Sequence, residues 1–316
     1  MRSLMQKNFN TSSINSYLIY PTLFKKGKIL CVFLSGIIIM MKESVTLLMK
    51  LVSVLLIVTI MVIACSPKPY SDTNKSYKKQ VKEFAKLLER YPLNDSAGLS
   101  YADQFVGTTN LSMRRPNYVI IHHTAQNSCD QTLKTFTLPR TQVSAHYVIC
   151  EDGTVYHMLN DLLRAHHAGV SKWGNATDIN SSSIGIELDN NGFEYFSEAQ
   201  IKSLSELLGR LKRTFNIPTA NFIGHGDIAP TRKNDPNWRF PWKQLAEEGF
   251  GLWWSDTTGV QVPAAFDRLS ALRIVGFDMK DTTAAIIGFK RHWLQDTTRG
   301  LNPAQEKVLY QLSRKF

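Results

Sequence analysis

The chain has 316 residues, of which 43% are hydrophobic and 20% charged, and its formal net charge at pH 7 is +11. This balance is typical of a globular protein and excludes a disordered chain. The basic charge fits either a solvated surface or an anionic polymer as partner. Because no nucleic-acid-binding motif accompanies the charge, we predict no nucleic-acid partner.

The first predicted element is an apolar segment near the N-terminus. Residues 51–64 are predominantly apolar, and Lys42 and Lys50 precede them, which is typical of a secretory signal. The segment ends in V-I-A-C at 62–65, which resembles the bacterial lipobox, so we predict that Cys65 is acylated and becomes the mature N-terminus. The alternative is a plain transmembrane anchor, which needs about 20 apolar residues, and the run is short for that.

The residues around this cysteine also predict where the protein resides. Ser66 after Cys65 resembles an outer-membrane sorting signal of Gram-negative bacteria. We therefore expect 1–64 to be an N-terminal extension and lipoprotein signal peptide. The mature chain is expected to be lipid-anchored on the periplasmic side, at the outer membrane. Residues 65–100 are predicted to be a tether with a short amphipathic helix at 77–91.

Residues 101–253 have the pattern of a mixed α/β domain. Ser197 and Gln200 form a capping box that opens an amphipathic helix. Short apolar or β-branched runs predict strands at 118–121, 143–150, 155–159, 184–188 and 222–223, with a hairpin turn at 151–154. Residues 254–316 predict three short helices, at 262–272, 282–293 and 303–313. The expected fold is a mixed central β-sheet flanked by helices, with a small C-terminal helical domain.

Metal-binding and acidic side chains stand at or just beyond the ends of these apolar runs. His122 and Glu187 each end a predicted strand, and His225, Lys233 and Asp235 follow the next one. Two imidazoles and a carboxylate can hold a catalytic zinc ion and leave its fourth position open for water. A second carboxylate can move a proton, and a lysine can neutralise an oxyanion. The alternatives are a structural core histidine, an ion-paired carboxylate and a surface lysine.

Other side chains are weaker candidates. His167 and Tyr147 are candidates for contacts with substrate, and Asn190 either offers an amide to substrate carbonyls or lies in a plain turn. Cys129 and Cys150 can form a disulfide in an oxidising compartment, but a separation of 21 residues does not determine their geometry.

Several separated segments within 115–253 resemble one known family, the zinc-dependent N-acetylmuramoyl-L-alanine amidases of the type-2 class. This class shares its fold with animal peptidoglycan-recognition proteins. The likeness is greatest to outer-membrane lipoprotein amidases. The matching segments, in the order of the family, are I-I-H-H-T, V-S-A-H-Y, H-A-G, S-I-G-I-E-L, G-H-G-D-I-A-P-T-R-K-N-D-P and F-P-W.

The resemblance implies one zinc ion per chain, held by His122, His225 and Asp235. It implies Glu187 as catalytic base and Lys233 as stabiliser of the transition state. The implied reaction is hydrolysis of the amide between N-acetylmuramic acid and L-alanine, in peptidoglycan or its fragments, for cell-wall remodelling or recycling.

The resemblance also divides the chain. Residues 101–253 are expected to form the zinc amidase domain, and 254–316 to form a helical domain like those that bind peptidoglycan. We expect a monomer whose partners are peptidoglycan or muropeptides, and the membrane through lipidated Cys65. Two alternatives are a non-catalytic peptidoglycan-binding protein of the same fold and a zinc hydrolase that cuts another amide.

Overall fold

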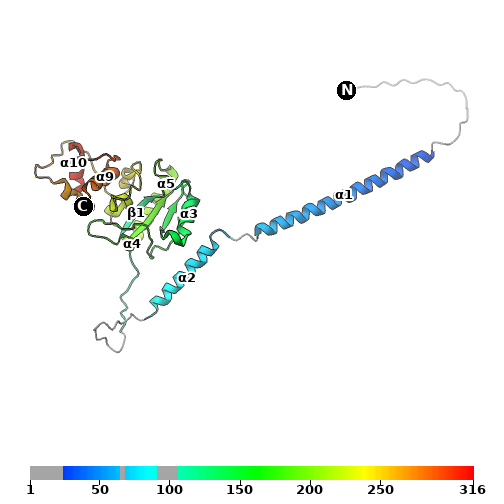
Figure 1. Ribbon diagram of the computed structural model, residues 1–316, viewed down its shortest axis with the longest axis horizontal. Helices are drawn as coiled ribbons and strands as arrows, with labels where there is room; N and C mark the ends of the chain where they lie inside the picture. The colour runs from blue at the N-terminus through cyan, green and yellow to red at the C-terminus, as the bar shows by residue number, and fades with distance from the viewer. Residues whose placement is uncertain (1–23, 65–67, 91–105) are drawn as a thin grey trace, which may run out of the picture. The chain divides into compact units, whose positions relative to one another are not determined.

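The computed structural model describes residues 24–64, 68–90 and 106–316, and the chain divides into two compact units, Met1–Leu93 and Asn94–Phe316 (Figure 1). The helices are α1 (Phe24–Ala64), α2 (Ser71–Leu88), α3 (Cys129–Thr137), α4 (Ile179–Ser182), α5 (Glu198–Phe215), α6 (His225–Ile228), α7 (Trp242–Glu247), α8 (Arg268–Val275), α9 (Thr282–Trp293) and α10 (Pro303–Ser313), with 3-10 turns at Pro139–Thr141 and Thr219–Asn221. The strands are β1 (Tyr118–His123), β2 (Tyr147–Ile149), β3 (Val155–His157), β4 (Ser183–Leu188) and β5 (Phe222–Gly224).

The helix α1 is longer than the apolar run read from the sequence. It contains a 30-residue apolar stretch, Val32–Met61, which by length and composition alone is able to cross a membrane. The helix continues upstream of the run at 51–64, through Lys42, and this adds the length that the run alone lacks for a membrane span. A signal sequence near the N-terminus has the same apolar character. The predicted lipidation site, Cys65, lies outside the described residues.

The short helix predicted at 77–91 is confirmed as α2, although it begins earlier. Asp72 lies in its first turn and Lys86 in its last, which matches the helix dipole at both ends. Its apolar side chains at Val81, Phe84 and Leu87 are exposed.

The five strands form one mixed sheet in the order β3-β2-β4-β1-β5. Strands β2, β4, β1 and β5 run parallel, and β3 pairs antiparallel with β2. Helices flank this sheet, so the predicted fold class is confirmed. Strand β2 is shorter than the predicted 143–150 because the backbone before it pairs elsewhere: Ser144 N donates to His166 O at 3.0 Å.

Helices cover both faces of the sheet, and the alternation of side chains along β1 determines what each face contacts. Val119 and Ile121 belong to a core that includes α5 and α7, whereas Ile120 belongs to a second core that includes α8, α9 and α10. By this alternation His122 points to the face of Ile120. Glu187 is paired with His122 in the register of β1 and β4 and shares that face.

The C-terminal helices are part of this second core. The predicted bounds of α9 and α10 are confirmed, while α8 begins later than 262 because the Asp267 side chain caps it, accepting from Leu269 N and Ser270 N at 3.1 Å each. Leu272 and Leu309 pack in the same core as Ile120. Asn94–Phe316 is therefore one compact unit, and the boundary at 253 remains a prediction about function.

A disulfide joins the start of α3 to the end of β2. The Cα atoms of Cys129 and Cys150 lie 5.3 Å apart, and the bond closes a separation of 21 residues. The sequence predicted neither α3 nor this geometry. A closed loop of this length stabilises a fold by about 3 kcal/mol in the chain-entropy model.

We therefore expect Cys129→Ser with Cys150→Ser to lower the free energy of unfolding by about 3 kcal/mol. Urea denaturation of wild type and double variant measures this directly. Reductant should move the wild-type midpoint to that of the variant and leave the variant unchanged. A wild-type midpoint that does not respond to reductant would contradict the structural role of the disulfide.

Candidate metal centre

The sheet register brings three of the predicted site residues to one edge. His122 on β1 lies opposite Glu187 on β4, and Ile121 lies opposite Gly224, the residue before His225. Because these strands are parallel neighbours, their carboxyl ends meet at the same edge of the sheet. A loop after α6 brings Asp235 to the same edge. A backbone hydrogen bond holds it there, in which Gly226 N donates to Asp235 O at 2.7 Å.

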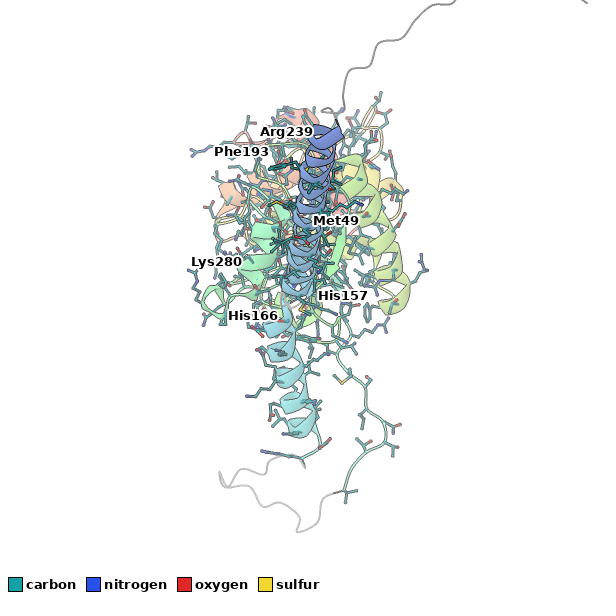
Figure 2. All side chains as sticks on the ribbon, turned by 90° about the vertical axis from the view of Figure 1, so that its right-hand side faces the viewer. Met49, His157, His166, Phe193, Arg239 and Lys280 are labelled. Carbon is teal, nitrogen blue, oxygen red and sulfur yellow. A yellow bond between two sulfur atoms is a disulfide. The ribbon has the colours of Figure 1, made fainter. Side chains whose placement is uncertain are left out.

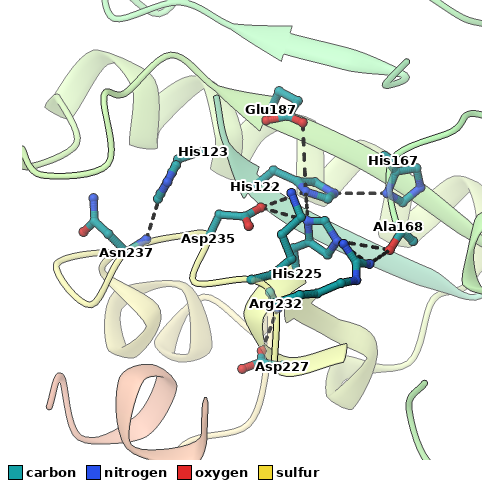
Figure 3. Close-up of polar contacts among 12 residues, drawn as sticks. His122, His123, His167, Ala168, Glu187, His225, Asp227, Arg232, Asp235 and Asn237 are labelled. Carbon is teal, nitrogen blue, oxygen red and sulfur yellow. Dashed lines mark hydrogen bonds and ion pairs between the residues drawn. The ribbon is translucent and has the colours of Figure 1, made fainter. Parts of the chain in front are cut away.

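His122, His225 and Asp235 place one ligand atom each at the corners of an equilateral triangle (Figure 3). His122 Nδ1, His225 Nδ1 and Asp235 Oδ2 lie 3.0 Å from one another in all three pairs. Tetrahedral zinc ligands at ~2.0–2.1 Å from the ion are separated by roughly 3.3 Å. All three residues are buried. The group is therefore able to bind a metal ion.

The protonation states favour the same reading. Burial, followed by the charge of the neighbouring His225, lowers the pKa of His122 to about 4, although the contact with Asp235 acts in the opposite direction. Burial alone would raise the pKa of Asp235, but hydrogen bonds with His122 and His225 hold it well below its usual range. At neutral pH His122 is thus a neutral imidazole and Asp235 a carboxylate, which are the forms that coordinate metals.

Glu187 lies beside this group without being part of it. Its Oε1 is 4.0 Å from His122 Nδ1, and its Oε2 is buried with no hydrogen-bond partner among the described residues. Burial, followed by the charge of Asp235, raises the pKa of Glu187 to about 8, and the half-buried Lys233 acts in the opposite direction. A residue that transfers protons needs a carboxylate oxygen without a hydrogen-bond partner, because that oxygen is available to water or substrate. Glu187 Oε2 is such an oxygen among the described residues.

His167 holds the ring of His122 rather than lining an open groove. His167 is buried, and its Nδ1 lies 3.0 Å from His122 Nε2 while its Nε2 lies 3.0 Å from Ser183 Oγ. Ser183 Oγ in turn donates to Ile179 O at 2.6 Å. If Nδ1 of His122 faces a metal, its Nε2–H donates to His167, and every proton in this chain has an acceptor. The contacts favour orientation of a ligand over the predicted contact with substrate.

The other histidine of the triangle contacts the loop before α4. His225 Nε2 lies 3.1 Å from Ala168 O, and Arg232 Nη2 donates to the same carbonyl at 2.5 Å. The position of the His167 ring also requires a glycine at residue 185, because a Cβ on Gly185 would lie 2.5 Å from that ring. By contrast His166, the residue before it, is exposed (Figure 2).

Two predicted substrate residues have their polar atoms engaged elsewhere. Asn190 is buried, donates to Glu194 O at 3.2 Å and accepts from Asn237 Nδ2 at 3.1 Å. Tyr147 is buried, and its hydroxyl donates to Asp161 Oδ1 at 2.6 Å. These hydrogen bonds favour structural roles for both residues and give no support to a contact with substrate.

Asn190 lies in a loop that is tied to the segment after Asp235. Asn237 N donates to His123 Nδ1 at 3.1 Å. This hydrogen bond engages the histidine that follows His122 on β1 and points to the opposite face of the sheet. Arg239 Nη1 donates to Phe193 O at 2.6 Å, and the two side chains lie near each other in Figure 2. The loop at 190–195 therefore packs against the segment that follows Asp235.

Sequence reasoning missed the residues that support the ligands. Ser183 orients His167, while Asp227, Arg291 and His292 join α9 to the loop that carries His225. The signal in the sequence was a run of three basic residues, Lys290-Arg291-His292, that follows the apolar stretch of the predicted helix at 282–293. A pattern of this kind does not reveal which distant segment the run contacts.

A mixed sheet with a buried His-His-Asp group at one edge and a lone carboxylate beside it provides the groups that metal-dependent hydrolysis needs. Residues 112–238 match the family model described as N-acetylmuramoyl-L-alanine amidase, which confirms the predicted resemblance. This part of the chain is thus similar to that family. All five candidate residues, His122, Glu187, His225, Lys233 and Asp235, lie within the matched range.

Two curated relatives show the same likeness. The N-acetylmuramoyl-L-alanine amidase AmiD of Escherichia coli is 37% identical over 155 residues, covering 44% of this chain and 55% of AmiD. The 1,6-anhydro-N-acetylmuramyl-L-alanine amidase AmpD of Haemophilus influenzae is 38% identical over 104 residues, covering 33% of this chain and 56% of AmpD. The chain spans about half the length of these curated relatives.

Solved structures extend the likeness beyond the matched family range. The structure of E. coli AmiD with the substrate anhydro-N-acetylmuramic acid-L-Ala-D-γ-Glu-L-Lys superposes with a TM-score of 0.58 at 28% identity, covering 66% of this chain and 93% of AmiD. AmpDh3 of Pseudomonas aeruginosa gives a TM-score of 0.60 at 27% identity, covering 69% of this chain and 99% of AmpDh3.

Proposed function

We propose that this protein is a zinc-dependent N-acetylmuramoyl-L-alanine amidase that hydrolyses the amide between N-acetylmuramic acid and L-alanine in peptidoglycan or its fragments. The observation that carries the proposal is the buried triangle of His122 Nδ1, His225 Nδ1 and Asp235 Oδ2, 3.0 Å on each side, with the Glu187 carboxylate 4.0 Å from His122. The relatives named for this activity supply the reaction and the substrate class.

In the proposed site His122, His225 and Asp235 hold one Zn²⁺ ion, which when bound polarises the scissile carbonyl and acidifies water. Glu187 takes a proton from the attacking water and returns it to the leaving amine. Its raised pKa of about 8 suits both tasks near neutral pH, and Lys233 and a bound cation favour the carboxylate form that must act first. The Lys233 ammonium, already close enough to influence Glu187, shares the charge of the oxyanion.

We further propose that the chain is exported and anchored through lipidated Cys65 on the periplasmic side of the outer membrane, where it acts as a monomer. Two observations support this location. The candidate span Val32–Met61 lies near the N-terminus, and the disulfide between Cys129 and Cys150 suits an oxidising compartment. The location also agrees with the proposed wall substrate. Metabolic labelling with a fatty-acid analogue, with Cys65→Ser as control, tests the lipid anchor.

The experiment that tests the activity is mass spectrometry of muropeptides incubated with the purified full-length chain in detergent, with and without a chelator. We expect release of free stem peptide that begins at L-alanine, with loss of release on chelation and recovery on adding Zn²⁺. Release of a different product would indicate a zinc hydrolase for another amide. Wall binding with zinc bound and no cleavage would indicate a recognition protein of this fold.

A further inference from the structure

The C-terminal helix α9 presents one face to the loop that carries two of the proposed zinc ligands. Gly288, Arg291 and His292 lie at positions i, i+3 and i+4 of this helix, so they share a face. A Cβ on Gly288 would lie 3.3 Å from Gly226 O and 3.3 Å from the Pro230 side chain. A larger residue at this position would therefore be crowded against the backbone directly after His225.

His292 is bonded to the turn that begins α6. Its Nδ1 donates to Asp227 Oδ2 at 2.7 Å, and the same oxygen accepts from Gly224 N at 2.7 Å. Gly224 is the residue immediately before His225. One carboxylate oxygen thus connects α9 to the backbone that sets the position of a ligand.

The imidazole of His292 has little freedom to move. It is 2% exposed and lies between two indole rings, with ring centroids 3.9 Å from Trp242 and 3.8 Å from Trp293. The rings are nearly parallel, at 12° and 16° to His292. Stacking on both faces holds the donor nitrogen in the direction of Asp227.

Arg291 adds a second connection, to the other end of the loop. Its Nη1 donates to Lys233 O at 3.4 Å, and a Cβ on Gly226 would lie 2.5 Å from that nitrogen. Gly226 N also donates to Asp235 O at 2.7 Å. The guanidinium therefore fills the space between the segment after His225 and the segment before Asp235.

We propose that α9 is a positioning element of the metal site: through His292 and Asp227 it fixes the backbone of His225, and through Arg291 it holds the loop that ends in Asp235. The inference rests on the proposed zinc site. Outer-shell groups that orient ligands typically change metal affinity by about 10–100-fold when removed. The helical segment 254–316 thus contributes to the metal centre, whatever it contributes to binding peptidoglycan.

The test compares zinc affinity of full-length variants by competition with a chelating dye, and the Co²⁺ absorption spectrum as a report of ligand geometry. His292→Phe keeps a flat ring between Trp242 and Trp293 but removes the donor, and we expect about 10–100-fold weaker zinc binding and an altered Co²⁺ spectrum. His292→Asn places an amide donor near the position of Nδ1, and we expect it to recover most of the affinity.

Leu309→Ala is the matched control, because Leu309 is a buried residue of the same C-terminal core. It should lower Tm without changing zinc affinity at a temperature where the variant is folded. Equal zinc affinity in wild type and His292→Phe would overturn the inference, and so would equal losses in His292→Phe and Leu309→Ala at matched stability. Absence of zinc binding in the wild type would instead overturn the proposed function.

Discussion

Replacing Asp235 by alanine should remove most of the zinc from the protein while leaving the fold intact. Asp235 provides the only carboxylate oxygen of the buried triangle, 3.0 Å from both His122 Nδ1 and His225 Nδ1. Without it, two neutral imidazoles face the ion, and the site loses both a ligand and the charge that offsets the metal. The expected loss of zinc affinity exceeds the about 10–100-fold that outer-shell changes cause, and metal analysis after dialysis measures it.

A second buried aspartate offers the matched control. Asp161 is 8% exposed, close to the 6% of Asp235, but it accepts from the Tyr147 hydroxyl at 2.6 Å, away from the triangle. Asp161→Ala should therefore lower stability and leave the zinc content unchanged. Full zinc occupancy in Asp235→Ala would show that this residue is not a ligand.

Replacing Glu187 by glutamine should abolish most of the turnover and keep the zinc. Glutamine preserves the size of the side chain but takes up no proton, and general acid–base catalysis contributes about 10²–10⁴ in rate. The expected loss in kcat is therefore roughly 10²-fold or more. Steady-state hydrolysis of a muropeptide, together with zinc analysis of the same sample, measures both quantities.

Stability provides the control for this variant. Burial raises the pKa of Glu187 to about 8, so the fold disfavours its charged form, and a neutral glutamine should leave the free energy of unfolding of the metal-free protein unchanged or higher. A loss of turnover without a loss of stability assigns the residue to the reaction. A Glu187→Gln enzyme that is as active as the wild type would refute the assignment.

Local pattern was sufficient to predict the elements that carry the site. The runs that end at His122 and Glu187 are strands, and α9 and α10 have the predicted bounds, because hydrophobic periodicity and caps act within a few residues. The box formed by Ser197 and Gln200 opens α5 as expected. The resemblance in residue type and order was sufficient to select the three candidate ligands, which the structure then brings together.

Long-range packing decided what these patterns leave open. Parallel pairing of β4, β1 and β5 places His122, Glu187 and His225 at one edge, and no local signal specifies which strands become neighbours. The same holds for the disulfide, which needs β2 and the start of α3 side by side, and for Asn190, whose amide is used within its own loop.

Sequence patterns specify the kinds of groups available: imidazoles and carboxylates at strand ends, within an α/β chain whose segments match one amidase family. Packing between distant segments determines which histidine orients another, and it places α9 beside the loop that carries His225, with His292 bonded to Asp227 at 2.7 Å. The physical reason is that hydrogen bonds of buried side chains depend on distances between segments, whereas sequence patterns report only the preferences of each segment.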